Sequence, residues 1–87
     1  MPEDNIKVII TEDHRIFRRG PIQSLASKRN IEIIAEAEHG LDLLEKMEYY
    51  QPDTITVGLQ MPIMDGLVTL PKLKQQFPAL RVIIITM

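Results

Sequence analysis

The fold of this chain is indicated most strongly by Thr54-Ile55-Thr56-Val57-Gly58. Its β-branched residues predict a short strand, and the turn-like residues 51–53 lead into it. Apolar runs of the same kind, typical of strands covered on both faces, occupy Ile6–Thr11, Ile31–Ala37 and Val82–Thr86. Between these runs, apolar residues recur at helical spacing in two segments, as Leu43, Leu44, Met47 and Tyr50 and as Leu67, Leu70, Leu73 and Phe77.

This alternation of strands and helices predicts an α/β fold with a doubly wound parallel sheet, because a helix that connects two strands must pack back onto their sheet. The first helix is expected over about residues 14–28. Pro21 should either kink this helix or mark the point where it restarts. In the third helix, Thr69 is suited to cap a late start that places Pro71 in the first turn.

Size, charge and composition restrict what the chain can do. Eighty-seven residues make one small domain, over residues 1–87, and the absence of cysteine excludes disulfides. No apolar run reaches the roughly 20 residues of a membrane span, so we expect a soluble, cytoplasmic protein without a membrane partner. The net charge of −2 gives no electrostatic basis for binding nucleic acid. Three arginines at helical spacing, Arg15, Arg18 and Arg19, are interpreted as a solvated helix face.

Three stretches carry a resemblance to a known family: residues 6–14, which end in Glu12-Asp13-His14, residues 54–66, and residues 82–86. Together they resemble the receiver domain of bacterial two-component response regulators, especially the subgroup in which the receiver precedes a helix-turn-helix output domain. The resemblance implies a flavodoxin-like sheet with the second strand at one edge, followed by the first, third and fourth. It also implies a domain truncated to about four strands and three helices, because the family's last strand and last two helices have no counterpart before Met87.

Residues that follow the strands of a parallel sheet converge at one edge, which here gathers Glu12, Asp13, Gly58, Gln60 and Thr86. In receivers, the positions that match Glu12 and Asp13 hold Mg²⁺, and the position that matches Gln60 lends its backbone carbonyl to the metal. The position that matches Thr86 carries a hydroxyl that senses the phosphoryl group. The position that matches Gly58 accepts the phosphoryl group, and the resemblance implies a histidine kinase as partner.

Glycine at position 58 has no nucleophile, whereas phosphoryl transfer needs a carboxylate aligned with the donor phosphorus. The predicted function is therefore a receiver-like module of a phosphorelay that is not competent for phosphorylation, and not an enzyme. Glycine also removes a hard oxygen ligand, so we expect Mg²⁺ binding to be weak or absent and no other cofactor to bind. On this interpretation the metal and phosphate-sensing positions are vestigial.

Each site residue also has a simpler structural interpretation. Glu12 and Asp13 suit the start of a helix, where Asp13 serves as a cap and both charges favour the helix dipole. Thr86 is an ordinary strand residue. His14 and His39 have no histidine or cysteine at metal-ligand spacing and are interpreted as surface residues.

Two other functions remain open. The first is an engineered or selected folding fragment without biochemical activity, favoured by the truncation, the missing nucleophile and the polar residues Thr54 and Thr56 in a covered strand. Apolar sheet surface around residues 82–85 would then be uncovered, and we expect a homo-oligomer, in its simplest form a dimer. The second is a metal-dependent enzyme that uses Glu12 and Asp13, although the sequence offers no base, nucleophile or phosphate loop to accompany them.

Overall fold

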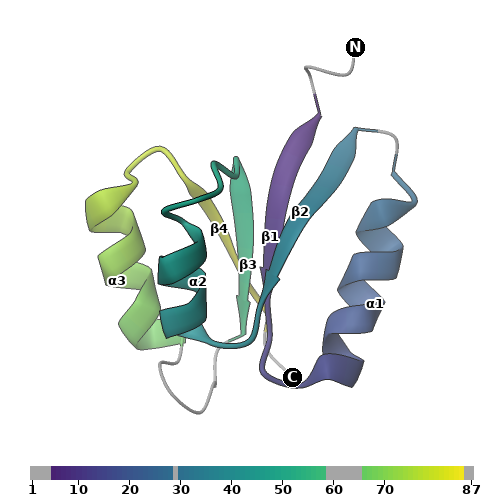
Figure 1. The fold of residues 1–87 in the computed structure, drawn as a ribbon, viewed down its shortest axis with the longest axis horizontal. Coiled ribbons are helices and arrows are strands. Elements are labelled where there is room, and N and C mark those ends of the chain that lie inside the picture. The colour runs from purple at the N-terminus through teal and green to yellow at the C-terminus, as the bar shows by residue number, and fades with distance from the viewer. Residues whose placement is uncertain (1–4, 29, 59–65, 86–87) are drawn as a thin grey trace.

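The computed structural model describes residues 5–28, 30–58 and 66–85 of the protein. Strands and helices alternate along these residues, which confirms the predicted order (Figure 1). The elements are β1 (Ile6–Thr11), α1 (Arg15–Ala26), β2 (Ile31–Ala37), α2 (Gly40–Lys46), β3 (Thr54–Gly58), α3 (Gly66–Gln76) and β4 (Arg81–Ile85).

The four strands form one parallel sheet in the order β2-β1-β3-β4. This order confirms the predicted α/β fold and its flavodoxin-like topology. β1 pairs with β3 in an unbroken register. Between β1 and β2 the register shifts by one residue, because Val8 pairs with Ile33 whereas Ile9 pairs with Ala35.

Helices cover the sheet on both faces, with α1 on one side and α2 and α3 on the other (Figure 1). The core lies on the side of α2 and α3, where Ile9, Ile55 and Val57 of the sheet cluster with Leu43 and Leu73 of the helices. All five side chains are fully buried. Burial of such aliphatic surface contributes about 25 cal/mol per Å² and is the main stabilising contribution in a core of this kind.

Two threonines of β3 share the α1 side of the sheet, because they alternate with the core residues of that strand. Thr54 is half-buried, whereas Thr56 is only 4% exposed. The hydroxyl of Thr56 finds no hydrogen-bond partner among the described residues, and the same holds for Thr11 at the end of β1. Each such buried hydroxyl costs roughly 1 to 3 kcal/mol, so β3 is less stable in this position than an aliphatic strand would be.

Two helices differ from the predictions at their prolines. α1 continues through residue 21, so the helix does not restart at Pro21. α3 already begins at Gly66 and contains Pro71, so the predicted late start at Thr69 is wrong. Thr69 and Leu73 lie one turn apart and are fully buried, which holds this part of the chain in the helix. The ring of Pro71 lies on the exposed side, where solvent can hydrogen-bond the carbonyl that loses its N–H partner.

α2 is shorter than its apolar spacing predicts. It ends at Lys46, and Met47 is its C-cap. Met47 is buried, but Tyr50 lies beyond the helix and is 39% exposed, so the predicted helical face that includes Tyr50 is wrong. Residues 47–49 form turns instead of a further helical turn.

Candidate functional site

The carboxyl ends of β1 and β3 lie side by side at one edge of the sheet. Thr11, the last residue of β1, pairs with Val57, and the residues that follow this pair are Glu12 and Gly58. Binding sites of open parallel sheets form at this edge, beyond the ends of the strands. The structure therefore places the Glu12–Asp13 pair next to the end of β3.

Two residues that the sequence assigns to the same edge, Gln60 and Thr86, lie outside the described residues, and so does Asp65. The described part of the site consists of the acidic pair, the residues that hold it, and Gly58.

Glu12 and Asp13 form a compact group with the neighbouring His14. One potential ligand atom from each of the three residues lies within 4.8 Å of the other two. The imidazole Nδ1 of His14 is 2.9 Å from Oδ1 of Asp13 and 3.5 Å from Oε1 of Glu12. The His14 side chain is 63% exposed, whereas those of Glu12 and Asp13 are mostly buried. His14 is thus a surface residue, as predicted, whose ring contacts two partly buried carboxylates.

The two carboxylates influence each other's protonation. Burial raises the pKa of Glu12, and the hydrogen bond and negative charge of Asp13 raise it further, against smaller contributions from His14. The hydrogen bond with Glu12 lowers the pKa of Asp13, which outweighs the effect of burial, and the nearby His14 lowers it as well.

The pair does not cap the helix that follows it. The N-cap of α1 is His14, and its side chain makes no capping hydrogen bond. The prediction that Asp13 caps this helix is therefore wrong, because the helix starts one residue later than a cap at Asp13 requires. Carboxylate oxygens are the ligands that Mg²⁺ prefers, so Glu12 and Asp13 fit a divalent cation, but position 58 adds no third carboxylate.

Gly58 ends β3 and is buried. None of the glycines in the described residues has a positive φ. The backbone at this position is therefore one that residues with side chains also adopt, and glycine is not required there for conformational reasons. What glycine changes at this edge is the chemistry of the position.

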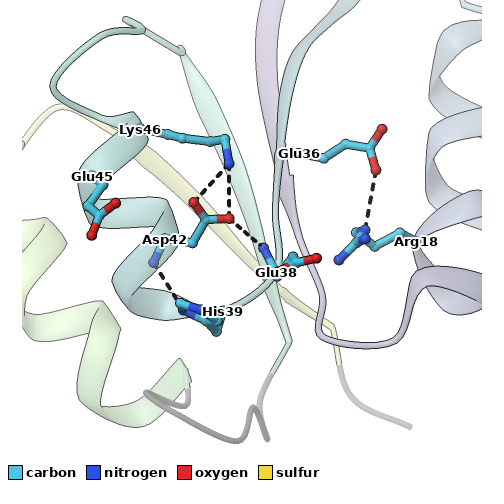
Figure 2. Close-up of a pocket in the computed structure, with 7 residues that line it drawn as sticks. All are labelled: Arg18, Glu36, Glu38, His39, Asp42, Glu45 and Lys46. Carbon is cyan, nitrogen blue, oxygen red and sulfur yellow. Dashed lines mark hydrogen bonds and ion pairs between the residues drawn. The ribbon is translucent and has the colours of Figure 1, made fainter.

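Arg18 is the residue of this region that sequence reasoning missed. It is only 5% exposed, so its assignment to a solvated helix face is wrong. Its Nη1 donates a hydrogen bond to the backbone carbonyl of Glu12, and its Nε lies 3.2 Å from Oε1 of Glu36 in β2 (Figure 2). The only sequence signal for this role is the position of Arg18 one turn into the helix that follows the acidic pair.

Comparison with known proteins identifies the family of the chain. Residues 8–87 match the response regulator receiver domain family. The chain belongs to this family. This match confirms the prediction that the chain is a receiver. Receiver domains are signalling modules. None of the helices in the described part of this receiver is long and apolar enough to cross a lipid bilayer.

The relatives of this receiver are longer proteins. It is 37% identical over 81 residues to the uncharacterized transcriptional regulatory protein YhcZ of Bacillus subtilis, and 32% identical over 84 residues to the transcriptional regulatory protein DegU of Brevibacillus brevis. These matches cover 93% and 97% of the chain but 38% and 36% of the two relatives. Its fold is similar to that of the Salmonella typhimurium RcsB response regulator, with a TM-score of 0.90 and 29% identity over 97% of this chain and 44% of that one.

A charged hollow of about 540 Å³ contains Arg18, the residue that binds the carbonyl of Glu12 (Figure 2). It lies between α1 and α2 beyond the end of β2, and it is lined by Arg18, Glu36, Glu38, His39, Asp42, Glu45 and Lys46. Figure 2 shows that Arg18 pairs with Glu36, and that Asp42 is joined to Lys46, to His39 and to the backbone of Glu38.

Asp42 is the centre of this network. Nδ1 of His39 accepts a hydrogen bond from the backbone N–H of Asp42 at 3.0 Å, which makes His39 a true N-cap of α2. The carboxylate of Asp42 in turn accepts the backbone N–H of Glu38 at 2.9 Å and pairs with Nζ of Lys46 at 2.8 Å. Partial burial alone would raise the pKa of Asp42, but its bonds to Lys46 and Glu38 and the charge of Lys46 lower it overall.

A larger hollow of about 900 Å³ lies at the opposite end of the strands of the receiver. Tyr49, Tyr50 and Phe77 line it, and Asp53 lies among them. The carboxylate of Asp53 accepts the backbone N–H of Lys7 at 2.9 Å and so belongs to the start of β1. Among the described residues, no trio of potential metal ligands lies at this end, so we place the functional site at the carboxyl edge.

Proposed function

We propose that this receiver acts in two-component signalling without accepting a phosphoryl group at position 58. The observation that supports this function is a glycine at the buried end of β3, level with Glu12 across the sheet. In the family, the carboxylate at this position attacks the donor phosphorus, and glycine has no group that can do so. Signalling by such a module depends on contacts, and a histidine kinase is the partner that family membership suggests.

The cation site is part of the same proposal. Glu12 and Asp13 would hold Mg²⁺ together with the backbone carbonyl of Gln60, and the metal would neutralise charge on phosphoryl oxygens. Loss of the third carboxylate weakens this binding. Thr86 supplies the hydroxyl of the family's phosphate-sensing position, which has no phosphoryl group to meet here. On this proposal the site retains the metal-binding and phosphate-sensing positions of a receiver but lacks the carboxylate that accepts the phosphoryl group.

Incubation with a small-molecule phosphodonor and Mg²⁺, followed by intact mass measurement, tests the proposal. The unsubstituted chain is expected to gain no phosphoryl group, whereas Gly58→Asp is expected to gain one. Gly58→Asn is the matched control, because its amide has the size of the carboxylate but is not a nucleophile. A phosphoryl group on an aspartate or glutamate of the unsubstituted chain would overturn the proposal.

β4 supports a second proposal. Within the described sheet it pairs only with β3, and its residues Ile83 and Ile84 are 53% and 39% exposed on opposite faces. Large aliphatic side chains on both faces of an edge strand favour association with another chain. We therefore propose that the isolated 87-residue polypeptide forms a homo-oligomer, in its simplest form a dimer, through this strand.

Light scattering over a range of concentrations tests self-association. The expected mass exceeds 10.0 kDa, and the double variant with Ile83→Thr and Ile84→Thr is expected to return it to 10.0 kDa. A 10.0 kDa particle at high concentration would contradict the proposal. If the chain is instead an engineered or selected folding fragment without activity, it will associate while Gly58→Asp still gains no phosphoryl group.

A further inference from the structure

We propose that Arg18 is a positioning residue that sets the cation affinity of the Glu12–Asp13 pair. The inference rests on the proposed function, because it concerns the same cation site. It assigns to Arg18 no direct contact with the cation. Its basis is the way in which the backbone of Glu12 is held.

The peptide groups on both sides of Glu12 are fixed by the end of β2. The backbone N–H of Glu12 donates to the carbonyl of Ala37 at 3.0 Å. Its carbonyl accepts a hydrogen bond from Nη1 of Arg18, and Nε of the same guanidinium is 3.2 Å from Glu36. Glu36 and Ala37 are adjacent in β2, so this strand holds the N–H of Glu12 directly through Ala37 and its carbonyl indirectly through the Glu36–Arg18 ion pair.

The burial of Arg18 is not explained by stability alone. Removing a guanidinium from water is costly, and replacing a buried ion pair by apolar residues of similar volume is often neutral or stabilising. Arg18 is 5% exposed, yet its guanidinium hydrogen-bonds only a loop carbonyl among the described residues, and its contact with Glu36, whose side chain is 51% exposed, is an ion pair in which Nε makes no hydrogen bond. A planar, rigid donor group suits such a bridge between two acceptors, whereas the single ammonium of lysine does not.

The affinity of the site for a cation depends on how the carboxylates of Glu12 and Asp13 are oriented. Groups that orient the ligands of a metal without touching it commonly change its affinity by about 10- to 100-fold when they are substituted. The charge of Arg18 acts in the opposite direction, because a positive group near the site repels a cation. Loss of charge predicts tighter binding of the cation, and loss of positioning predicts weaker binding, so the sign of the change separates the two effects.

The experiment is a titration with Mn²⁺ alone, followed by electron paramagnetic resonance of the free ion. It uses the full 87-residue chain, both with Gly58 and in the Gly58→Asp background, where the third carboxylate strengthens binding. Arg18→Met and Arg18→Lys are expected to weaken Mn²⁺ binding about tenfold or more. Arg19→Met is the matched control, because Arg19 is exposed on the same helix, and its Mn²⁺ affinity should stay within about twofold of the parent.

A second substitution tests the anchor of Arg18. Glu36→Gln keeps an oxygen that can accept from the guanidinium, so its Mn²⁺ affinity should fall less than that of Glu36→Leu, which has no acceptor. Far-UV circular dichroism and the urea midpoint show whether each variant is folded. Arg18→Lys retains the charge and gives a second measurement if Arg18→Met does not fold.

The outcomes distinguish this inference from the proposed function. Mn²⁺ affinity of Arg18→Met equal to or tighter than that of its parent would overturn the positioning role, even if Gly58→Asp binds Mn²⁺ and accepts a phosphoryl group. If Gly58→Asp neither binds Mn²⁺ nor gains a phosphoryl group, both the proposed function and this inference are wrong.

Discussion

Two helices of this receiver begin in the same way and use their polar residues differently. β1 leads into α1 through Glu12-Asp13-His14, and β2 leads into α2 through Glu38-His39. At the start of α2, Nδ1 of His39 and the carboxylate of Asp42 accept backbone N–H groups, so these side chains stabilise the helix itself. At the start of α1, the side chain of His14 makes no capping bond. A similar local sequence thus produces a closed network in one place and a potential ligand group in the other.

The difference lies in what packs against each turn. The turn before α2 is held by side chains, because His39 and Asp42 accept backbone N–H groups, whereas the turn before α1 is held mainly through the backbone of Glu12, by Arg18 of α1 and Ala37 of β2. A helix start that is fixed by its own side chains has none to spare for a ligand. At the start of α1 the backbone of Glu12 supplies the main anchors, and its carboxylate adds a longer bond, in which Oε1 accepts the backbone N–H of His14 at 3.3 Å.

The largest effect on stability is expected at Arg18, which anchors the turn before α1. Arg18→Ala removes both polar contacts and the packing of the side chain, and should lower the free energy of unfolding by about 2 kcal/mol. This is below the 3 to 5 kcal/mol typical of a fully buried pair, because water can reach the half-exposed Glu36. Urea unfolding measures the loss. Arg19→Ala, on the exposed side of α1, should change stability by less than about 0.5 kcal/mol. Equal losses of stability for Arg18→Ala and Arg19→Ala would contradict the role of Arg18 as an anchor.

Substitution of His14 and His39, the N-caps of α1 and α2, tests whether the two helix starts differ. His39→Ala removes the acceptor that caps α2 and should destabilise the protein by about 1 kcal/mol, whereas His39→Asn retains a good cap and should be nearly neutral. His14→Ala removes no capping bond, so its effect in the absence of a cation should stay below about 0.5 kcal/mol. The same urea titration measures all three. Equal losses at His14 and His39 would show that the two helix starts do not differ.

Asp42 adds a dependence on pH at the α2 start. The pKa of Asp42 is lowered in the folded protein, so its stabilising contribution is present above the pKa of the unfolded chain, about 3.9, and is lost as the pH falls through the folded value. Asp42→Asn should therefore cost about 0.5 kcal/mol at neutral pH and progressively less in acid. Unfolding free energies measured from neutral pH to about pH 3 check this, and a constant difference between the two proteins would contradict it.

The smallest effect is expected at Glu12 and has the opposite sign. Burial raises the pKa of Glu12, so the folded protein holds this proton more tightly than the unfolded chain, and the contribution to stability is lost as the pH rises through the folded pKa. Without a cation at neutral pH, Glu12→Gln should stabilise the protein by about 0.3 kcal/mol, and saturating Mg²⁺ should reverse the order because glutamine is the weaker ligand. Thermal unfolding with and without Mg²⁺ measures both changes.

The order of strands and helices could be predicted because it follows from local patterns. β-branched runs mark the strands, and in a parallel sheet the residues after them must share an edge, which places Glu12 and Asp13 beside Gly58 without further information. The burial of Arg18 could not be predicted in this way, because it depends on Glu36, a residue of another strand. The predicted ends of α2 and α3 were wrong for a related reason.

At the start of α3, the burial of Thr69 against the core outweighs its capacity to act as a cap, and it carries Pro71 into the helix. Capping preference is a contribution of about 1 kcal/mol, whereas burial of a whole helical face contributes several times more. Local signals therefore locate the elements of this receiver, and tertiary packing decides where they begin and end.

The register shift between β1 and β2 changes the face of the sheet toward which the last side chains of β2 point. Val8 pairs with Ile33 but Ile10 pairs with Glu36, so two steps along β1 correspond to three along β2. In an uninterrupted ladder, Glu36 would stand opposite Thr11 and project to the far side of the sheet, away from α1. The one extra residue in β2 turns Glu36 toward the helix that carries Arg18. A change of length in this edge strand would thus reach the acidic pair without altering any residue of it.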